Sequence, residues 1–138
     1  MNRGKEFEKY LEDLCSVLES HGIYTEHKST TRLADGTPVK GEPMDFEILA
    51  RGRILKFDAK ECGEVRWNLK KNARQNDKLK QAKANGADAF YLVWFKLWNK
   101  AVRFDVEQVM EAAEQGVKSL RVNDGPVWEW ERLLEGVA

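Results

Sequence analysis

Two aspartates and a lysine in the middle of the chain have the types and spacing to do chemistry together. They are Asp45, Asp58 and Lys60. Carboxylate oxygens are the ligands that Mg²⁺ prefers, and a lysine ammonium can orient a water molecule or offset charge on a phosphate. A metal held by the two carboxylates would polarise a phosphate, activate a water and stabilise the leaving oxygen. The three residues therefore indicate metal-dependent hydrolysis of a phosphodiester bond.

The segments around these residues predict a β-hairpin that would bring them together. Two apolar-rich runs, Asp45–Ala50 and Ile54–Lys60, flank a short turn that contains a glycine. The turn would place Asp45 opposite Asp58 or Ala59, where opposed Cβ atoms lie roughly 4.5–5.5 Å apart. Two carboxylates at that distance repel each other unless a cation lies between them. The hairpin therefore predicts a magnesium site, to which the backbone carbonyl of Ala59 would add a further oxygen.

Two residues outside the hairpin could support this site. Glu8, on a predicted helix, would be an extra metal ligand, and Gln75, on a later helix, would contact the water or the phosphate. The alternative for each is an ordinary solvated helix residue. His21 and His27 are expected at the surface or in turns. The tripeptide Asp-Ala-Lys is common by chance, so the prediction depends on its setting in a hairpin followed by a basic helix.

The net charge of zero hides an uneven distribution. Residues 51–83 contain eleven basic and four acidic side chains, whereas residues 105–138 contain three basic and eight acidic ones. A basic middle and an acidic end indicate a face that binds a polyanion, and the alternative is a solvated, lysine-rich helix. The basic residues that we expect to contact DNA in this stretch are Arg66, Lys70, Lys71, Arg74 and Lys78.

The composition is that of a single globular domain. The chain has 138 residues, of which 42% are hydrophobic and 33% are charged. We expect residues 1–138 to form one nuclease domain, with a core at about 4–104 and a C-terminal extension at about 105–138. No apolar run approaches the roughly 20 residues of a membrane-spanning helix. Cys15 and Cys62 have no ligand spacing for zinc, so we expect reduced thiols in a cytoplasmic protein.

The elements before the hairpin are a helix, a strand and a loop. Apolar residues recur at helical spacing over Gly4–His21, and Gly22 would end this helix. Ile23–Lys28 predicts a strand. Residues 29–43 contain Ser, Thr, Gly and Pro and few large apolar residues, which favours a long loop. Long loops in compact domains are uncommon and often functional.

The elements after the hairpin complete an α/β pattern. Leu69–Asn85 predicts a lysine-rich helix, Ala89–Phe95 a central strand buried on both faces, and Ala101–Phe104 a shorter strand. Asp105 would cap a further helix, with Gln108 completing a capping box. The segments that follow are a short strand at 117–122 and a stretch at 127–134 that could be helix or strand. The predicted order of the core is α-β-β-β-α-β-β-α.

Five segments resemble one known family. They are Gly4–Lys9, Met44–Glu47, Lys56–Glu61, Arg74–Lys83 and Gly116–Arg121. Together they resemble the Holliday junction resolvases of the PD-(D/E)xK superfamily, particularly the RecU-like branch and its phage-borne relatives. The first segment is similar to the opening helix of that branch, and the second and third are similar to its two motif strands.

The resemblance implies a fold, a cofactor and a substrate. The fold would be restriction-endonuclease-like, with a mixed five-stranded sheet flanked by helices. The cofactor would be Mg²⁺ or Mn²⁺, and a homodimer would cut a four-way DNA junction in the cytoplasm of a bacterial or phage-infected cell. Asp45 and Asp58 would be metal ligands and Lys60 the catalytic lysine, with Glu8 and Gln75 as supporting residues.

The chain also departs from the pattern of this family. Met44 stands between Pro43 and Asp45, and the loop at 29–43 is shorter than a stalk that penetrates a junction. Two other readings therefore stay open: another nuclease of the superfamily, of restriction, repair or nicking type, and a DNA-binding module that has lost catalysis. The loop residues expected to line a DNA path or contact phosphate are Lys28, Ser29, Thr30, Thr31, Arg32 and Lys40.

Overall fold

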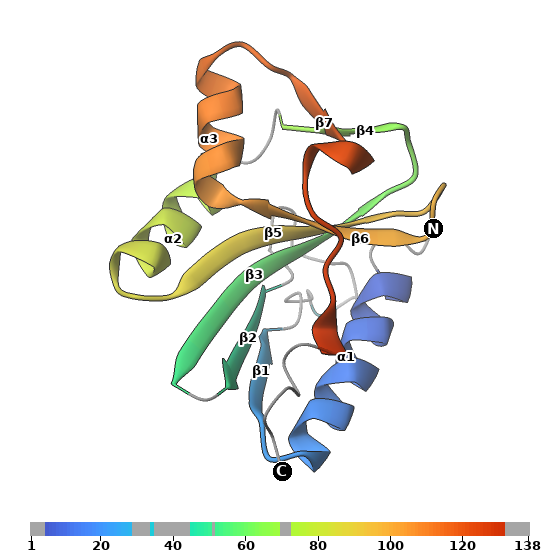
Figure 1. Ribbon diagram of the computed structural model, residues 1–138, viewed down its shortest axis with the longest axis vertical. Helices are drawn as coiled ribbons and strands as arrows, with labels where there is room; N and C mark the ends of the chain where they lie inside the picture. Colours follow the sequence, from blue (N-terminus) through green and yellow to red (C-terminus); the bar gives the residue numbers. More distant parts are fainter. Residues whose placement is uncertain (1–4, 29–33, 35–44, 51, 70–72, 132–138) are drawn as a thin grey trace.

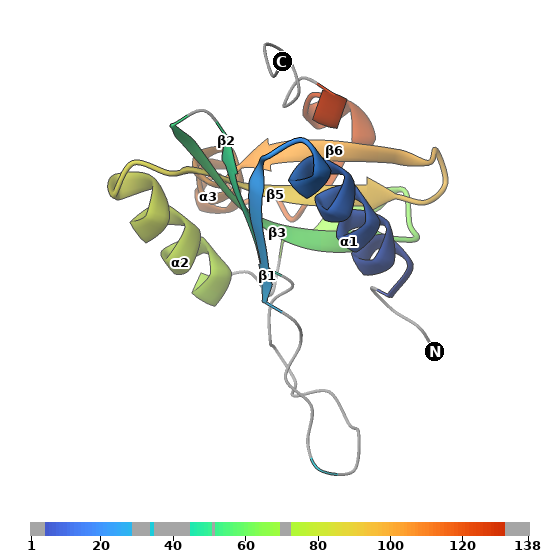
Figure 2. The same ribbon diagram turned by 90° about the horizontal axis from the view of Figure 1, so that it is seen from below.

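A computed structural model describes residues 5–28, 34, 45–50, 52–69 and 73–131. A twisted sheet forms the middle layer, with one helix on one face and two helices on the other (Figures 1 and 2). The helices are α1 (Lys5–Ser20), α2 (Ala73–Ala84) and α3 (Val106–Glu114), with a short 3-10 helix η1 (Val122–Asp124). The strands are β1 (Tyr24–Lys28), β2 (Asp45–Ala50), β3 (Arg53–Cys62), β4 (Arg66–Asn68), β5 (Asp88–Phe95), β6 (Lys100–Asp105) and β7 (Ser119–Arg121).

The main sheet has five strands in the order β1-β2-β3-β5-β6. Neighbouring strands run antiparallel except β3 and β5, which are parallel and joined through α2. A parallel pair needs such a crossover connection, because the chain must return to the same edge of the sheet. The expected α/β fold, with a mixed five-stranded sheet flanked by helices, is confirmed, as is the order α-β-β-β-α-β-β-α of its main elements.

The β2–β3 hairpin has the predicted register. Its turn contains Gly52 at a φ of 79°, in the left-handed region that a glycine adopts without steric cost. Pairing then runs from Ala50 opposite Arg53 to Asp45 opposite Asp58. Side chains alternate along β3, so the catalytic candidates share one face of the strand and the large apolar residues share the other.

Helix α1 covers one face of the sheet because its apolar side chains form a single stripe. Phe7, Leu11 and Leu18 are almost completely buried against Phe46 and Phe57 of the hairpin. Gly22, at a φ of 83°, ends the turn after the helix, as expected.

Helices α2 and α3 cover the other face. Leu79 of α2 and Val109 of α3 pack in the same cluster as Tyr91 and Val93 of β5. Strand β5 is therefore enclosed by helices on both sides, which confirms the expectation of a central buried strand.

Two short strands form a separate sheet. The short strand expected at 117–122 is confirmed as β7, whereas β4 was not predicted. β4 pairs antiparallel with β7, through Trp67 opposite Leu120. The backbone N–H of Leu69 continues this contact by donating to the carbonyl of Lys118 at 2.9 Å. The prediction that a helix begins at Leu69 is therefore wrong, and α2 begins at Ala73. Strands of three residues are too short to show a period of two in the sequence.

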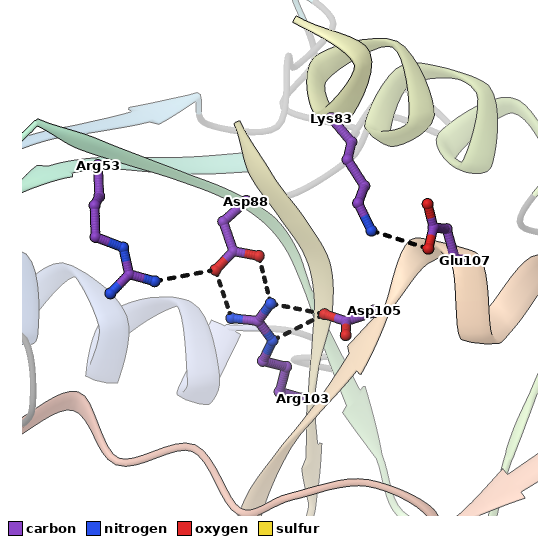
Figure 3. A network of polar contacts seen from close by, with 6 residues as sticks. All are labelled: Arg53, Lys83, Asp88, Arg103, Asp105 and Glu107. Atoms are coloured by element: carbon purple, nitrogen blue, oxygen red, sulfur yellow. Dashed lines mark hydrogen bonds and ion pairs between the residues drawn. The ribbon is translucent and has the colours of Figure 1, made fainter. Parts of the chain in front are cut away.

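The capping box predicted at α3 is wrong as well. Asp105 precedes the helix in an extended conformation, but it makes no side-chain capping hydrogen bond. Its carboxylate accepts hydrogen bonds from Arg103 instead, as Figure 3 shows. The Gln108 side chain donates to the backbone carbonyl of Asp124 at 2.7 Å. Both polar groups are thus used in tertiary contacts.

Asp88 links three strands at one end of the sheet (Figure 3). The guanidinium of Arg103, on β6, also pairs with both carboxylate oxygens of Asp88 on β5. Arg53 of β3 lies 3.7 Å from the same carboxylate. A separate ion pair of 3.1 Å between Lys83 and Glu107 joins α2 to α3.

The segment after η1 crosses the sheet as a strap. Arg103 donates its backbone N–H to Pro126, and Val127 forms an isolated bridge with Val102. Trp128 then packs on Phe57, with ring centroids 5.6 Å apart. The segment at 127–134 was expected to be either helix or strand. Up to residue 131 it contains this bridge and the start of a 3-10 turn, and residues 132–138 lie outside the described part. None of the described helices is long and apolar enough to cross a membrane.

Candidate active site

Strands β2 and β3 bring the three predicted catalytic residues together. Asp45, the first residue of β2, pairs directly with Asp58 of β3. Lys60 follows on the same face, and its Nζ lies 3.4 Å from Oδ2 of Asp58. The described pairing of β3 with β2 ends at this aspartate pair, so Ala59 lies just beyond the last paired position. The hairpin therefore presents two carboxylates and an ammonium where the two strands part.

The carboxylate of Asp58 is buried in a setting that does not satisfy it. The residue has 0% relative exposure, and both of its oxygens lack a hydrogen-bond partner. Burial raises the pKa of this carboxyl to about 7, with a further rise from Asp45, while the neighbouring Lys60 opposes the rise. Removal from water disfavours the charged form, and a second negative charge nearby adds to that cost. A divalent cation would relieve both effects.

The residues present fit a divalent metal ion. Asp45 has 9% relative exposure and Asp58 offers two buried oxygens that no hydrogen bond uses. Carboxylates are hard donors of the kind that Mg²⁺ and Mn²⁺ bind. Two carboxylates from protein, with water and phosphate completing the shell, are a usual set for Mg²⁺.

Helix α2 closes the site from one side. Gln75 lies at its start with 9% relative exposure, and the charge of Lys78 lowers the pKa of Asp58, so this lysine lies close to the site. Tyr91 pairs with Asp58 across the parallel strands and donates its hydroxyl to Asn76 of α2 at 2.6 Å.

Tyr91 and Asn76 were missed in the sequence. The Tyr91 hydroxyl has a raised pKa, first because of burial and then because of the nearby aspartates. The apolar run around Tyr91 predicted a buried strand, but only the β3–β5 register reveals that its ring adjoins the site. The pair fixes α2 to the floor of the site.

Glu8 takes part in a different cluster. Its Oε2 lies 3.1 Å from His27 Nε2, and Oε1 of Glu12 lies 3.3 Å from the other ring nitrogen, Nδ1. Within the described part of the chain, these three residues are the one group of three or more possible metal-ligating side chains. The structure therefore does not bring Glu8 into a ligand cluster with the two aspartates.

His27 is not the surface residue that we expected. Its side chain is 14% exposed and its ring stacks on Phe46, with centroids 4.2 Å apart and planes 2° from parallel. The sequence signal that could have found it is alternation along β1, which places His27 on the face toward α1. His21, in contrast, is exposed in the turn after α1, as expected.

The predicted DNA-contacting residues fall into three groups. Arg66 on β4 and Lys78 on α2 have exposed side chains. Lys28 and Arg74 lie on β1 and α2, and only their backbone is described. The remaining ones lie outside the described residues: Ser29, Thr30, Thr31, Arg32, Lys40, Lys70 and Lys71.

The mixed five-stranded sheet and its hairpin have the arrangement of the PD-(D/E)xK nuclease fold. Residues 2–124 match the family described as RecU, Recombination protein U. The chain belongs to this family, which is a family of Holliday junction resolvases. It is therefore a nuclease with the function of a Holliday junction resolvase.

Two further comparisons were made with known proteins. No curated protein matches the chain. Among solved structures, it is similar to Hjc, a Holliday junction resolvase from the archaeal hyperthermophile Archaeoglobus fulgidus, at 22% sequence identity and a TM-score of 0.46. That match covers 72% of this chain and 76% of the archaeal one.

Proposed function

We propose that Asp45, Asp58 and Lys60 are the catalytic residues with which this resolvase hydrolyses a phosphodiester bond at a four-way junction. The observation that carries the proposal is the buried carboxylate of Asp58, which, besides its ion pair with Lys60, has no hydrogen-bond partner and lies directly opposite a second carboxylate. Such a pair is costly in a fold unless a cation neutralises it. A DNA-binding module without catalytic activity would have no use for this unfavourable pair of carboxylates.

The two aspartates would hold Mg²⁺ or Mn²⁺, with the carbonyl of Ala59 as a third protein ligand. When bound, the metal would polarise the phosphate, lower the pKa of a bound water and stabilise the leaving oxygen. Lys60 would hold the attacking water in line, or offset charge on the phosphate, from its position beside Asp58. Gln75, at the start of α2, would orient the same water or the phosphate.

Glu8 would support the site from α1. To reach the metal it would first have to leave the ion pair with His27. We therefore propose that the pair controls when Glu8 is available as a ligand, and that Asp45 and Asp58 provide the permanent part of the site.

The DNA would lie along the basic stretch beside the hairpin. Arg66 and Lys78 have exposed side chains that can contact phosphates, and Lys70, Lys71 and Arg74 belong to the same stretch. Lys28, Arg32 and Lys40 would line the DNA path as well, and Ser29, Thr30 and Thr31 would contact phosphate. Phosphate contacts give affinity without sequence preference, which suits an enzyme that reads the shape of DNA.

We propose that residues 1–138 form one nuclease domain that acts as a homodimer. Resolution of a junction needs two symmetric cuts, and a two-fold dimer presents two equivalent active sites. The place of action would be the cytoplasm of a bacterial or phage-infected cell, where branched DNA arises. Light scattering at several protein concentrations would measure the dimer directly, and a monomer at all of them would contradict this part of the proposal.

The test of the function is a cleavage assay. An immobile four-way junction, a linear duplex and a flap of related sequence would be incubated with the protein in Mg²⁺, in Mn²⁺ and in EDTA. Paired, symmetric nicks confined to the junction and dependent on the metal are expected. Equal cutting of all three DNAs would leave a nuclease but reject junction specificity, and binding without cutting in either metal would reject the catalytic assignment.

A further inference from the structure

A hollow lies on the face of the sheet opposite to the catalytic aspartates. The described side chains that line its volume of about 370 Å³ are Glu6, Phe7, Tyr10, Trp94, Asn99 and Ala101. It lies between the start of α1 and the turn from β5 to β6. Trp94 pairs with Glu61, which is three residues beyond Asp58 along β3, or roughly 10 Å in a strand. The hollow is thus near the catalytic site but separate from it.

One wall of the hollow is a fixed aromatic surface. The buried ring of Phe7 stacks on Tyr10, with centroids 6.1 Å apart, and packs at a tilt on Trp94 at 5.7 Å. Tyr10 is nevertheless 48% exposed. Trp130 and Glu131 lie near the hydroxyl end of Tyr10. A large ring that packs on Phe7 and is still half-exposed is suited to stacking with a flat ligand.

The polar groups around this wall can both donate and accept hydrogen bonds. Trp94 Nε1 donates to Oδ1 of Asn99 at 3.1 Å, which leaves the Nδ2 end of that amide as the donor toward a ligand. Asn99 has a φ of 50° in the turn from β5 to β6, a left-handed conformation that asparagine tolerates in turns. Glu6 supplies an acceptor. Nζ of Lys96 lies 5.4 Å from the Trp94 ring centroid and 3.4 Å from Oε1 of Glu61, so this ammonium is already paired with a carboxylate.

We propose that this hollow binds an unpaired nucleobase of the branched DNA substrate. A base offers a flat π-face for Tyr10 and an edge with donors and acceptors for Asn99 and Glu6. Free phosphate or an acidic ligand suits the hollow poorly, because Glu6 is part of its lining. A base released at the branch point would anchor the junction on one face of the sheet while the strand to be cut reaches Asp58 on the other.

The test uses two immobile four-way junctions, one fully paired and one with a single unpaired 2-aminopurine at the branch point. Binding is measured in EDTA, where the DNA stays uncut. The wild-type protein is expected to quench 2-aminopurine fluorescence and to bind the second junction roughly 5- to 100-fold more tightly, the range for stacking of one base. Tyr10→Leu keeps an apolar side chain against Phe7 but removes the stacking ring. This variant should lose the quenching and the preference, with unchanged affinity for the fully paired junction.

Two further variants test whether the effect of Tyr10→Leu on binding is specific to the hollow. Tyr24→Leu is the matched control, since Tyr24 is a similarly exposed tyrosine (54%) on β1, away from the hollow. It should behave as the wild type does. Asn99→Gly removes the amide while a glycine accepts the positive φ, and it should weaken binding of the unpaired base only. Absence of quenching in the wild-type protein, or an equal preference in Tyr10→Leu, would overturn the proposal.

Discussion

At the scale of single residues, the catalytic hairpin shows which contacts can be predicted from sequence. Asp45, Asp58 and Lys60 were predictable because a short hairpin has few registers and alternation fixes the faces. The contact of Tyr91 with this site was not, because it depends on the pairing of β3 with a strand distant in sequence. The pairing of His27 with Glu8 likewise depends on the angle of α1 to the sheet.

Asp58→Asn should abolish cleavage and preserve junction binding. The substitution keeps the shape of the side chain but removes the charge that would hold the metal, and loss of at least about 100-fold in rate is expected, as for other residues that stabilise charge in the transition state. Lys60→Ala should also stop cleavage. Initial rates with Mg²⁺ and gel-shift titrations would measure the two effects separately.

Glu47→Gln and Lys56→Ala are the matched controls. Glu47 and Lys56 form a partly exposed ion pair of 2.9 Å one row further along the same face of the hairpin. Partly exposed pairs of this kind contribute little stability, so both variants should cut at close to the wild-type rate. Normal cleavage by Asp58→Asn or Lys60→Ala would show that the site is wrongly assigned.

The raised pKa of Asp58 makes the stability of the metal-free protein depend on pH. Below about pH 4 the carboxyl is protonated in the folded and the unfolded chain. Between the usual value of 3.8 and about 7, the unfolded chain ionises first, so stability falls as the pH rises, by up to about 4 kcal/mol. Above pH 7 this loss stays constant.

Thermal unfolding in EDTA from pH 4 to 8 would measure this loss. The stability of Asp58→Asn relative to the wild-type protein should rise over the same range, because the variant has no carboxyl to ionise there. Mg²⁺ should restore the wild-type protein and not the variant. A stability difference independent of pH would contradict the buried state of Asp58.

At the scale of elements, length and periodicity decided what could be predicted. Helix α1, the hairpin and β5 have several turns or alternations, and their positions were expected to within a few residues. β4 and β7 have three residues each and pair with each other across some fifty residues of sequence. The strand expected at 117–122 contains β7, but neither a period of two nor a turn indicated β4 or its pairing with β7. The start of α2 was misplaced for the same reason, because Leu69 belongs to the contact with β7.

Gly125→Ala should destabilise the protein by loosening the strap after η1. A Cβ at Gly125 would collide with the backbone oxygen of Arg103 and would lie 3.0 Å from the ring of Phe104. Crowding of this kind costs about 1–3 kcal/mol in a packed region. Gly63→Ala is the control, since a Cβ at Gly63 meets nothing within 4 Å. Urea unfolding of both variants would check this, and equal stability would mean that the strap is not packed as described.

At the scale of the whole molecule, the neutral chain separates its charges. The basic residues gather in the stretch that holds the hairpin and α2, and the acidic ones gather after β6. Junction affinity should therefore fall steeply with salt, with a slope set by the number of phosphates contacted. Lys78→Ala should lower both affinity and slope, because its exposed side chain lies on α2 in the basic stretch. Filter-binding titrations from 50 mM to 300 mM salt would measure both, and an unchanged slope in Lys78→Ala would remove this lysine from the DNA path.

Strand β3 pairs with β2, which is its neighbour in sequence, and with β5, which is distant in sequence. This difference has a consequence for the time course of folding. The β2–β3 hairpin joins segments that are neighbours in sequence and can form within microseconds. Strand β5 can pair with β3 only after the chain has crossed back through α2. Asp45 and Asp58 would meet early, in water, as two ordinary acids. Their site would acquire its affinity for metal only when Tyr91 arrives, so Mg²⁺ should slow unfolding and leave the early refolding phase unchanged. In stopped-flow experiments, acceleration of that early phase by Mg²⁺ would show that the site matures before the sheet is complete.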